Sequence, residues 1–231
     1  MDFSHPVEAL IPGAAGRVLA ALARVDAELS VSRLAAVAGV GRTRASVVLS
    51  DLAQLGVVSR RQVGPTTLVR LDRANIGGDL VARLGDVRNQ AIQKLRDEAR
   101  AIDPQPICLI VFGSFARGTG RAASDIDLLA VRPPDADVDR WSEGLTKFGA
   151  FAENLTGNTV QILDYGVSDL RSRYSSRNHE AGGQFWQSVT EDAITLAGVG
   201  LRELARADRG AWGEAAPGKQ GGRSGVSGEG T

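Results

Sequence analysis

Two aspartates one residue apart, Asp125 and Asp127, follow a Gly-Ser turn at Gly113-Ser114 within a short stretch of the chain. Glycine lets backbone approach a bulky anion closely, and the free N–H groups at the start of a helix favour phosphate. Two carboxylates beside such a turn suit Mg²⁺, which prefers hard oxygen ligands and keeps substrate phosphates in its shell. A Gly-Ser turn or an Asp-x-Asp pair alone is common. Their combination predicts a site for a nucleoside triphosphate (NTP) and Mg²⁺.

The elements that must position these residues follow from the hydrophobic pattern. Residues 107–112 are a short apolar run rich in β-branched side chains, which predicts a buried strand rather than a helix. A helix is expected to begin near Phe115, and a second strand should cover residues 126–131. Because side chains alternate along a strand, Asp125 and Asp127 should face the same side, with their Cα atoms roughly 6.6 Å apart.

Further polar side chains near the turn are candidates for binding the phosphates. Ser114 adds a hydroxyl, and Arg117 or Arg121 adds a cation. Two metal ions about 3.5–4 Å apart can stabilise both the attacking and the leaving oxygen of an in-line displacement. The pattern therefore predicts a reaction at a phosphorus atom.

The run Gly113-Ser114-x-Ala116-Arg117-Gly118, followed by Ser124-Asp125-Ile126-Asp127-Leu128, resembles the signature of the polymerase-β-type nucleotidyltransferase superfamily. The likeness extends over about residues 80–200 and is to the small bacterial members and the aminoglycoside nucleotidyltransferases in particular. It implies a mixed β-sheet flanked by helices. It also implies transfer of a nucleotidyl group, expected to be AMP, from an NTP to a hydroxyl acceptor with release of pyrophosphate.

The resemblance assigns candidate roles to six positions of this chain. Asp125 and Asp127 are the candidate catalytic residues and Mg²⁺ ligands. The candidate nucleotide-binding residues are Gly113, Ser114, Arg117 and Ser124.

One position departs from the pattern of that superfamily, whose active members usually supply a third carboxylate from the next strand. The strand expected at residues 159–165 places Gln161 there, and a neutral amide cannot accept a proton. Asp164 lies three residues on and should point to the opposite face. The missing carboxylate could instead come from Asp164 through a register shift, or from an outside residue such as Glu153 or Glu180. The remaining alternatives are an acceptor that needs no base, or nucleotide binding without fast turnover.

Composition narrows the class of protein. The 231 residues are enough for one large or two small domains, and 43% are hydrophobic. The formal net charge is zero, so no global field draws the chain to nucleic acid or membrane. The one cysteine, Cys108, excludes an internal disulfide and a zinc cluster and agrees with a reducing compartment. No apolar run approaches the roughly 18 residues of a membrane span, and no secretory signal is visible. A cytoplasmic bacterial protein without membrane partners is expected.

Residues 1–75 show the order helix, helix–turn–helix and β-hairpin. Helices are expected at 13–25, 31–38 and 42–55, and strands at 57–63 and 66–71. Ser30 should cap the second helix, with Val37 facing inward, and Leu55 should belong to the apolar face of the third. This order resembles a winged helix-turn-helix domain, whose third helix would lie in the major groove of double-stranded DNA.

Candidate DNA contacts lie at the start of that third helix and in the hairpin. They are Arg42, Thr43, Arg44, Ser46, Arg60 and Arg61. The segment holds nine arginines against six acidic residues, which is a small excess for a DNA-binding domain. Docking of another protein, or dimerisation, is the alternative role.

One long amphipathic helix is expected at residues 79–102, packed on the sheet, with a coiled-coil homodimer as the less favoured alternative. A helix is expected at 138–156, and residues 193–197 form a strand or a helix end. His179 is a weak candidate base in a polar loop.

The expected fold is of the α+β, mixed class. Its segments are a winged helix-turn-helix domain at 1–75, a connecting helix at 76–104, a nucleotidyltransferase domain at 105–204 and a disordered tail at 205–231. Two rival hypotheses stand beside the enzyme. One is a DNA-binding regulator that uses the nucleotidyltransferase fold as a nucleotide sensor. The other is a toxin–antitoxin component that modifies tRNA or protein.

Overall fold

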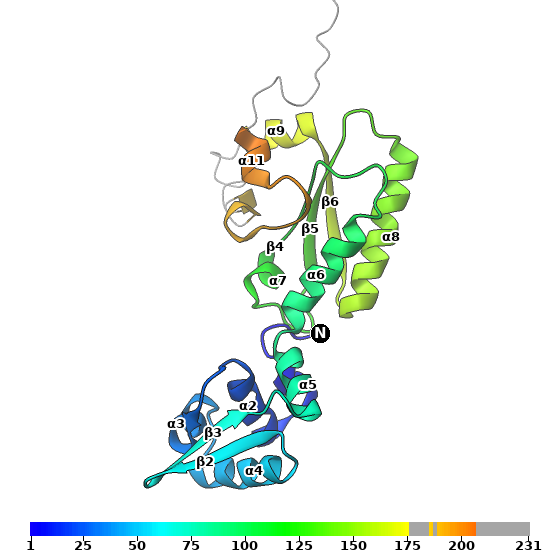
Figure 1. Cartoon of the computed structure of the whole chain (residues 1–231). Helices are drawn as coiled ribbons and strands as arrows, with labels where there is room; N and C mark the ends of the chain where they lie inside the picture. The colour runs from blue at the N-terminus through cyan, green and yellow to red at the C-terminus, as the bar shows by residue number, and fades with distance from the viewer. Residues whose placement is uncertain (176–184, 187–188, 207–231) are drawn as a thin grey trace, which may run out of the picture.

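The computed structural model describes residues 1–175, 185–186 and 189–206. His179, Glu180 and residues 207–231 of the expected tail lie outside the described residues, whereas the first two residues of that tail, 205 and 206, belong to helix α11 Leu201–Arg206. The described chain forms two lobes, each with its own sheet and its own hydrophobic core (Figure 1).

The N-terminal lobe packs short helices against a three-stranded antiparallel sheet of order β1-β3-β2. In chain order its elements are α1 Pro6–Leu10, α2 Gly13–Ala23, β1 Leu29–Ser30, α3 Val31–Val37, α4 Arg42–Gln54, β2 Val58–Val63 and β3 Thr66–Leu71. Leu22, Leu34 and Leu49 are fully buried at its centre. The helices expected near α2, α3 and α4 and the hairpin are all present. The one-turn helix α1 and the two-residue strand β1 were not expected, because neither is long enough to show a period.

Two side chains expected to face inward in this lobe do not. Val37 is 59% exposed and Leu55 is 69% exposed. Val37 is the last residue of α3 and Leu55 is the residue that caps the end of α4, so each helix has already passed the core there. The predicted cap of α3 is correct, because the Ser30 hydroxyl accepts a hydrogen bond from the Arg33 N–H.

The long helix expected at 79–102 is in fact two helices, α5 Ile76–Gly85 and α6 Val87–Ala99, which meet at Asp86. Val81, Ala82 and Leu84 of α5 pack into the N-terminal core, whereas the apolar residues of α6 pack into the core of the other lobe. The apolar stripe continues through both helices, which is why its period did not reveal the break. A Cβ at Gly85 would lie 2.9 Å from Ala23 of α2, so close packing of the two helices favours glycine there.

The C-terminal lobe contains a four-stranded mixed sheet of order β6-β5-β4-β7, in which only β5 and β6 are parallel. Its elements are β4 Cys108–Phe112, α7 Gly113–Arg117, β5 Ile126–Arg132, α8 Val138–Thr156, β6 Val160–Gly166, α9 Val167–Ser175, β7 Ile194–Gly198 and α11 Leu201–Arg206. This confirms the mixed sheet flanked by helices. Helices α6 and α8 cover one face, and α9 and α11 lie on the other (Figure 1).

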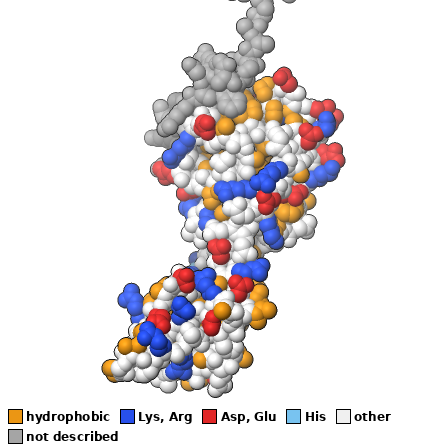
Figure 2. All heavy atoms as spheres, viewed as in Figure 1, with side chains coloured by type: hydrophobic (Ala, Val, Ile, Leu, Met, Phe, Trp, Pro, Cys, Tyr) orange, Lys and Arg blue, Asp and Glu red, His pale blue; other side chains and the backbone are white. Residues whose placement is uncertain are grey.

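The surface carries no block of like charge on the face seen in Figure 2, where basic and acidic side chains are interspersed over both lobes. This agrees with a formal net charge of zero. Across the described part of the chain, no helix combines the length and the apolar character needed to cross a bilayer.

Candidate active site

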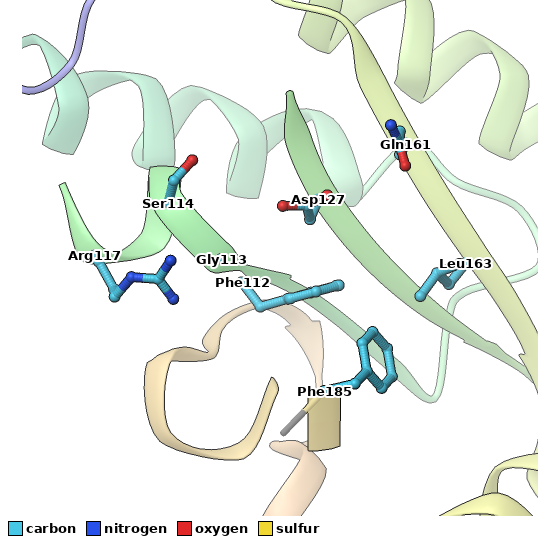
Figure 3. A pocket seen from close by; sticks show the side chains of 8 residues that line it. All are labelled: Phe112, Gly113, Ser114, Arg117, Asp127, Gln161, Leu163 and Phe185. Carbon is cyan, nitrogen blue, oxygen red and sulfur yellow. The ribbon is translucent and has the colours of Figure 1, made fainter. Parts of the chain in front are cut away.

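A pocket lies at the edge of the C-terminal sheet where β4 ends and where β5 and β6 begin. β4 runs antiparallel to β5 and β6 runs parallel to it, so these three strand ends meet. Register aligns Phe112 with Asp127, and Asp127 with Gln161. The pocket has a volume of about 490 Å³ and is lined by Phe112, Gly113, Ser114, Arg117, Asp127, Gln161, Leu163 and Phe185 (Figure 3).

The turn after β4 contacts the second aspartate directly. Gly113 is buried and has φ +73°, a conformation that L side chains rarely adopt. A Cβ at this position would lie 2.5 Å from Asp127 Oδ2. Only glycine therefore allows the turn and the carboxylate to pack so closely.

The helix after the turn is shorter than the sequence argument assumed. α7 has five residues and ends at Arg117. The next residue, Gly118, caps it with φ +75° and donates its N–H to the carbonyls of Phe115 and Ser114. A single turn has a small dipole, because the dipole grows with the number of aligned peptide units. Binding of an anion here would therefore depend on individual N–H groups, the Ser114 hydroxyl and the Arg117 guanidinium. Arg117 also forms an ion pair with Asp192.

The two aspartates and Gln161 lie side by side across the strands. Gln161 Nε2 donates a hydrogen bond of 2.7 Å to Asp125 Oδ2, whereas Asp127 and not Asp125 lines the pocket. Partial burial and the neighbouring charge of Asp125 raise the pKa of Asp127, and Arg117 opposes this in part. A cation beside both carboxylates would relieve that cost.

The donor set suits Mg²⁺ bound jointly by protein and nucleotide. Asp125 and Asp127 supply hard oxygen ligands, and phosphate oxygens usually complete the shell of this ion. A metal site made of protein ligands alone is not found: among the described residues, no group of three or more His, Cys, Asp or Glu could hold a metal ion.

Ser124 does not line the pocket, and its side chain forms a hydrogen bond within its own loop. Its hydroxyl accepts a hydrogen bond of 3.0 Å from the Arg121 N–H. Asn158, which is buried, donates to the carbonyls of Arg121, Ala122 and Ser124 and so fixes the loop that leads to Asp125. Sequence reasoning missed Asn158, because a Gly-Asn pair after a helix is an ordinary turn signal.

Two of the residues considered for the role of the third carboxylate, Asp164 and Glu153, lie elsewhere, and Glu180 is outside the described residues. Asp164 pairs with Arg132 at 3.5 Å, and with Glu153 it lines a groove between α8 and β6, outside the pocket. The alternation argument for Asp164 is therefore correct, and no register shift is recorded between β5 and β6. Gln161 occupies the position beside the two aspartates.

An apolar wall, also missed from the sequence, faces the polar row. Figure 3 shows Ser114, Asp127 and Gln161 on one side, with Phe112, Leu163 and Phe185 opposite. The rings of Phe112 and Phe185 pack edge to face, with centroids 5.8 Å apart. Phe185 is far away in sequence and belongs to no motif, so nothing in the sequence indicated its contact with the site.

The candidate DNA contacts of the N-terminal lobe do not all lie together. Arg42, Ser46 and Arg60 line one cleft of about 220 Å³, whose other lining residues are Ser30, Val31, Ser32, Pro65, Thr66 and Thr67. Thr43 and Arg44 are exposed outside that cleft. Arg61 donates both its Nε and Nη2 to the Glu28 carboxylate.

Comparison with solved structures gives distant similarities. A crystal structure of a toxin–antitoxin with AMP-PNP is 19% identical, with coverage of 49% of this chain and 80% of that chain and a TM-score of 0.33. A tri-AMPylated Shewanella oneidensis HEPN toxin in complex with MNT antitoxin is 15% identical, with coverage of 51% of this chain and 80% of that chain and a TM-score of 0.31. TrmBL2, an archaeal chromatin protein, is 17% identical, with coverage of 70% of this chain and 68% of that chain and a TM-score of 0.27.

One segment of the chain matches a family model. No curated protein matches the chain significantly. The model of the nucleotidyltransferase domain family matches residues 92–173, which include most of α6 and all of β4, α7, β5, α8 and β6. Every lining residue of the pocket except Phe185 falls within that segment. The chain therefore contains a nucleotidyltransferase domain.

Proposed function

We propose that this chain transfers a nucleotidyl group, AMP, from an NTP to a hydroxyl acceptor in the presence of Mg²⁺. The observation that carries the proposal is the direct packing of the Gly113 turn on Asp127 inside one pocket. An anion-binding turn and a metal-binding carboxylate in contact are what a metal–triphosphate complex requires.

Each residue of the pocket has a role in this proposal. The backbone of Gly113, the Ser114 hydroxyl and Arg117 bind the triphosphate, and Asp125 and Asp127 hold Mg²⁺. Bound Mg²⁺ would neutralise phosphate charge and favour in-line displacement. The acceptor oxygen forms a bond to the α-phosphorus, and the bond from that phosphorus to the leaving pyrophosphate breaks. Because the Gln161 amide cannot accept the acceptor's proton, the proton is lost to solvent and turnover is expected to be modest.

The direct test incubates the purified chain with Mg²⁺, cell extract and each α-labelled NTP in turn, and follows both transferred label and pyrophosphate. Asp127→Asn should abolish transfer, since it removes a metal ligand and its charge. Asp164→Asn is the matched control, because Asp164 is on the same sheet but outside the pocket. Circular dichroism of both variants checks that they are folded.

The outcome also separates the rival hypotheses. Label on a small molecule, a tRNA or a protein identifies the class of acceptor. Tight binding of an NTP with no label on any acceptor would contradict the enzyme and support a nucleotide sensor. The presence of Gln161 beside Asp125 favours that second candidate, because an amide at the third position cannot accept a proton.

We also propose that the N-terminal lobe is a winged helix-turn-helix domain that binds double-stranded DNA. The order of α2, α3, α4 and the β2–β3 hairpin supports this, as does the cleft that combines Arg42 and Arg60 with several hydroxyl side chains. Guanidinium and hydroxyl groups together suit DNA phosphates.

Measurement of DNA affinity against salt concentration tests this second proposal. Arg42→Ala and Arg60→Ala should each weaken binding to duplexes of any sequence and lower the salt slope by about one. Arg61→Ala should change less, because Glu28 already neutralises Arg61. A wild-type chain that binds no duplex at low salt would rule the proposal out.

A further inference from the structure

The short helix α7 is contacted by the two segments that connect the lobes. One is residues 1–5, which precede α1, and the other is α6, which follows α5. Figure 1 marks the N-terminus at the junction of the lobes, close to α6. Both ends of the N-terminal lobe therefore lie beside the nucleotide site.

Phe3 packs on α7 from the first of these segments. Its side chain is buried, and its ring meets the Phe115 ring edge to face with centroids 4.7 Å apart. The N–H groups of Phe3 and Ser4 both donate to the Gly120 carbonyl, at 2.9 and 3.0 Å. This segment thus contacts α7 and the loop that follows it.

Arg88 binds α7 from the second segment. Its Nε donates to the Phe115 carbonyl at 2.7 Å, and its Nη2 donates to the Ala116 carbonyl. Carbonyls at the end of a helix lack N–H partners within the helix and favour a cation. The Arg88 side chain is half-buried, so its charge is partly removed from water, and the two carbonyls compensate for that loss.

A helix of five residues is too short to be stable on its own. Yet α7 bears Ser114 and Arg117 and begins at Gly113, which packs on Asp127. A small rotation of α7 would therefore displace several of the groups proposed to bind the triphosphate. We propose that Arg88 is a positioning residue for this nucleotide-binding turn, and that Phe3 supports the turn from the other side.

This inference rests on the proposed nucleotide site. Its test distinguishes failure of the role given to Arg88 from failure of the proposed function. Calorimetric titration with Mg²⁺ and ATP gives the Kd of the wild type, Arg88→Ala, Arg88→Lys and Phe3→Leu. Arg88→Ala should weaken ATP binding about tenfold, and Arg88→Lys about threefold, because lysine restores the charge but not the paired donors. Added guanidinium ion at millimolar concentration should restore binding to Arg88→Ala, which a general loss of stability would not allow.

Arg100→Ala is the matched control. Arg100 caps the other end of α6, is exposed and forms an ion pair with Asp97 on the same helix, so its removal should leave the Kd unchanged. In steady-state assays, Arg88→Ala should raise the KM for the NTP while kcat changes little, as expected for lost ground-state binding.

Three results would overturn the inference. If Arg88→Ala binds ATP as the wild type does, Arg88 does not position the turn, although the proposed function survives. If Arg88→Ala is unfolded, the Kd values of Arg88→Lys and Phe3→Leu for ATP provide the test instead. Values equal to that of the wild type in both variants overturn the inference. If the wild type binds no NTP at all, the proposed function fails and the inference fails with it.

Discussion

At the scale of single residues, Asp127 combines a proposed metal-binding role with a cost in stability. Burial and the charge of Asp125 raise its pKa above the ordinary value of 3.8. The folded state therefore binds this proton more tightly than the unfolded state does. As a result, the free energy of unfolding falls as the pH rises through the two pKa values.

We predict that Asp127→Asn raises the melting temperature of the metal-free protein at neutral pH, by up to a few degrees. The gain should shrink as the pH falls through the raised pKa of the folded state, and it should vanish below 3.8, where the carboxyl is protonated in both states. Differential scanning fluorimetry with a chelator present measures this. Asp164→Asn should show no gain, since it removes the ion pair with Arg132. A lower melting temperature for Asp127→Asn at neutral pH would refute the electrostatic argument.

Cys108 gives a second prediction at this scale. It is fully buried in β4, and burial raises the pKa of its thiol to about 12. The thiolate is the reactive form, so the native protein should resist alkylation at neutral pH. Mass spectrometry after treatment with iodoacetamide should find no adduct on the native chain and one adduct in concentrated denaturant. Rapid labelling of the native chain would show that β4 is accessible.

At the scale of elements, the loop between α7 and β5 depends on Asn158. Its Nδ2 donates to the carbonyls of Arg121, Ala122 and Ser124 at 3.1, 3.2 and 2.9 Å. Asn158 follows α8 and is 4% exposed, so its own buried amide finds its acceptors in this loop. One side chain thus links the end of α8 to the loop that leads to Asp125.

We predict that Asn158→Ala costs about 1–3 kcal/mol of stability, because it removes three hydrogen bonds that join the end of α8 to this loop. It should also lower nucleotidyl transfer, since the loop that carries Asp125 loses its support. Urea unfolding followed by tryptophan fluorescence gives the first quantity, and pyrophosphate release gives the second. Asn89→Ala is the control, because Asn89 is exposed and bonds only to Asp86. An equal effect of both variants would contradict the role given to Asn158.

At the scale of the whole molecule, the two lobes have separate hydrophobic cores. α5 packs into the first core and α6 into the second. Apolar side chains before Asp86 therefore contact the N-terminal lobe, and those after it contact the C-terminal lobe. All three tryptophans, Trp141, Trp186 and Trp212, follow this point in the sequence. Tryptophan fluorescence therefore reports on the C-terminal part alone.

We predict that urea unfolds the protein in two steps that different probes separate. Far-ultraviolet circular dichroism should follow both lobes, whereas tryptophan fluorescence should follow only the second. Mg²⁺ and ATP together should stabilise the fluorescence transition, by about 2.7 kcal/mol at a hundredfold excess over the Kd. The step seen only by circular dichroism should shift less. Coincident transitions with both probes would show that the contacts at Phe3 and Arg88 join the lobes into one cooperative unit.

The sequence by itself determined the elements that have a clear period and the residues of the central motif. The strands around Leu109 and Leu128 are apolar runs of strand length, and helix α8 has an apolar stripe, so local pattern was sufficient for each. The family resemblance placed Gln161 beside the two aspartates. Side-chain alternation placed Asp164 on the opposite face, because that argument needs only the parity of positions along a strand.

Only the tertiary structure decided what depends on contacts between distant segments. The break at Asp86 arises because α5 and α6 pack on different cores, although their apolar stripe is continuous in the sequence. Phe185 joins the pocket, and Phe3 and Arg88 reach α7, through pairings that no local period encodes. Periodicity records which face of an element is buried but not which neighbour buries it, and these contacts are fixed by that neighbour.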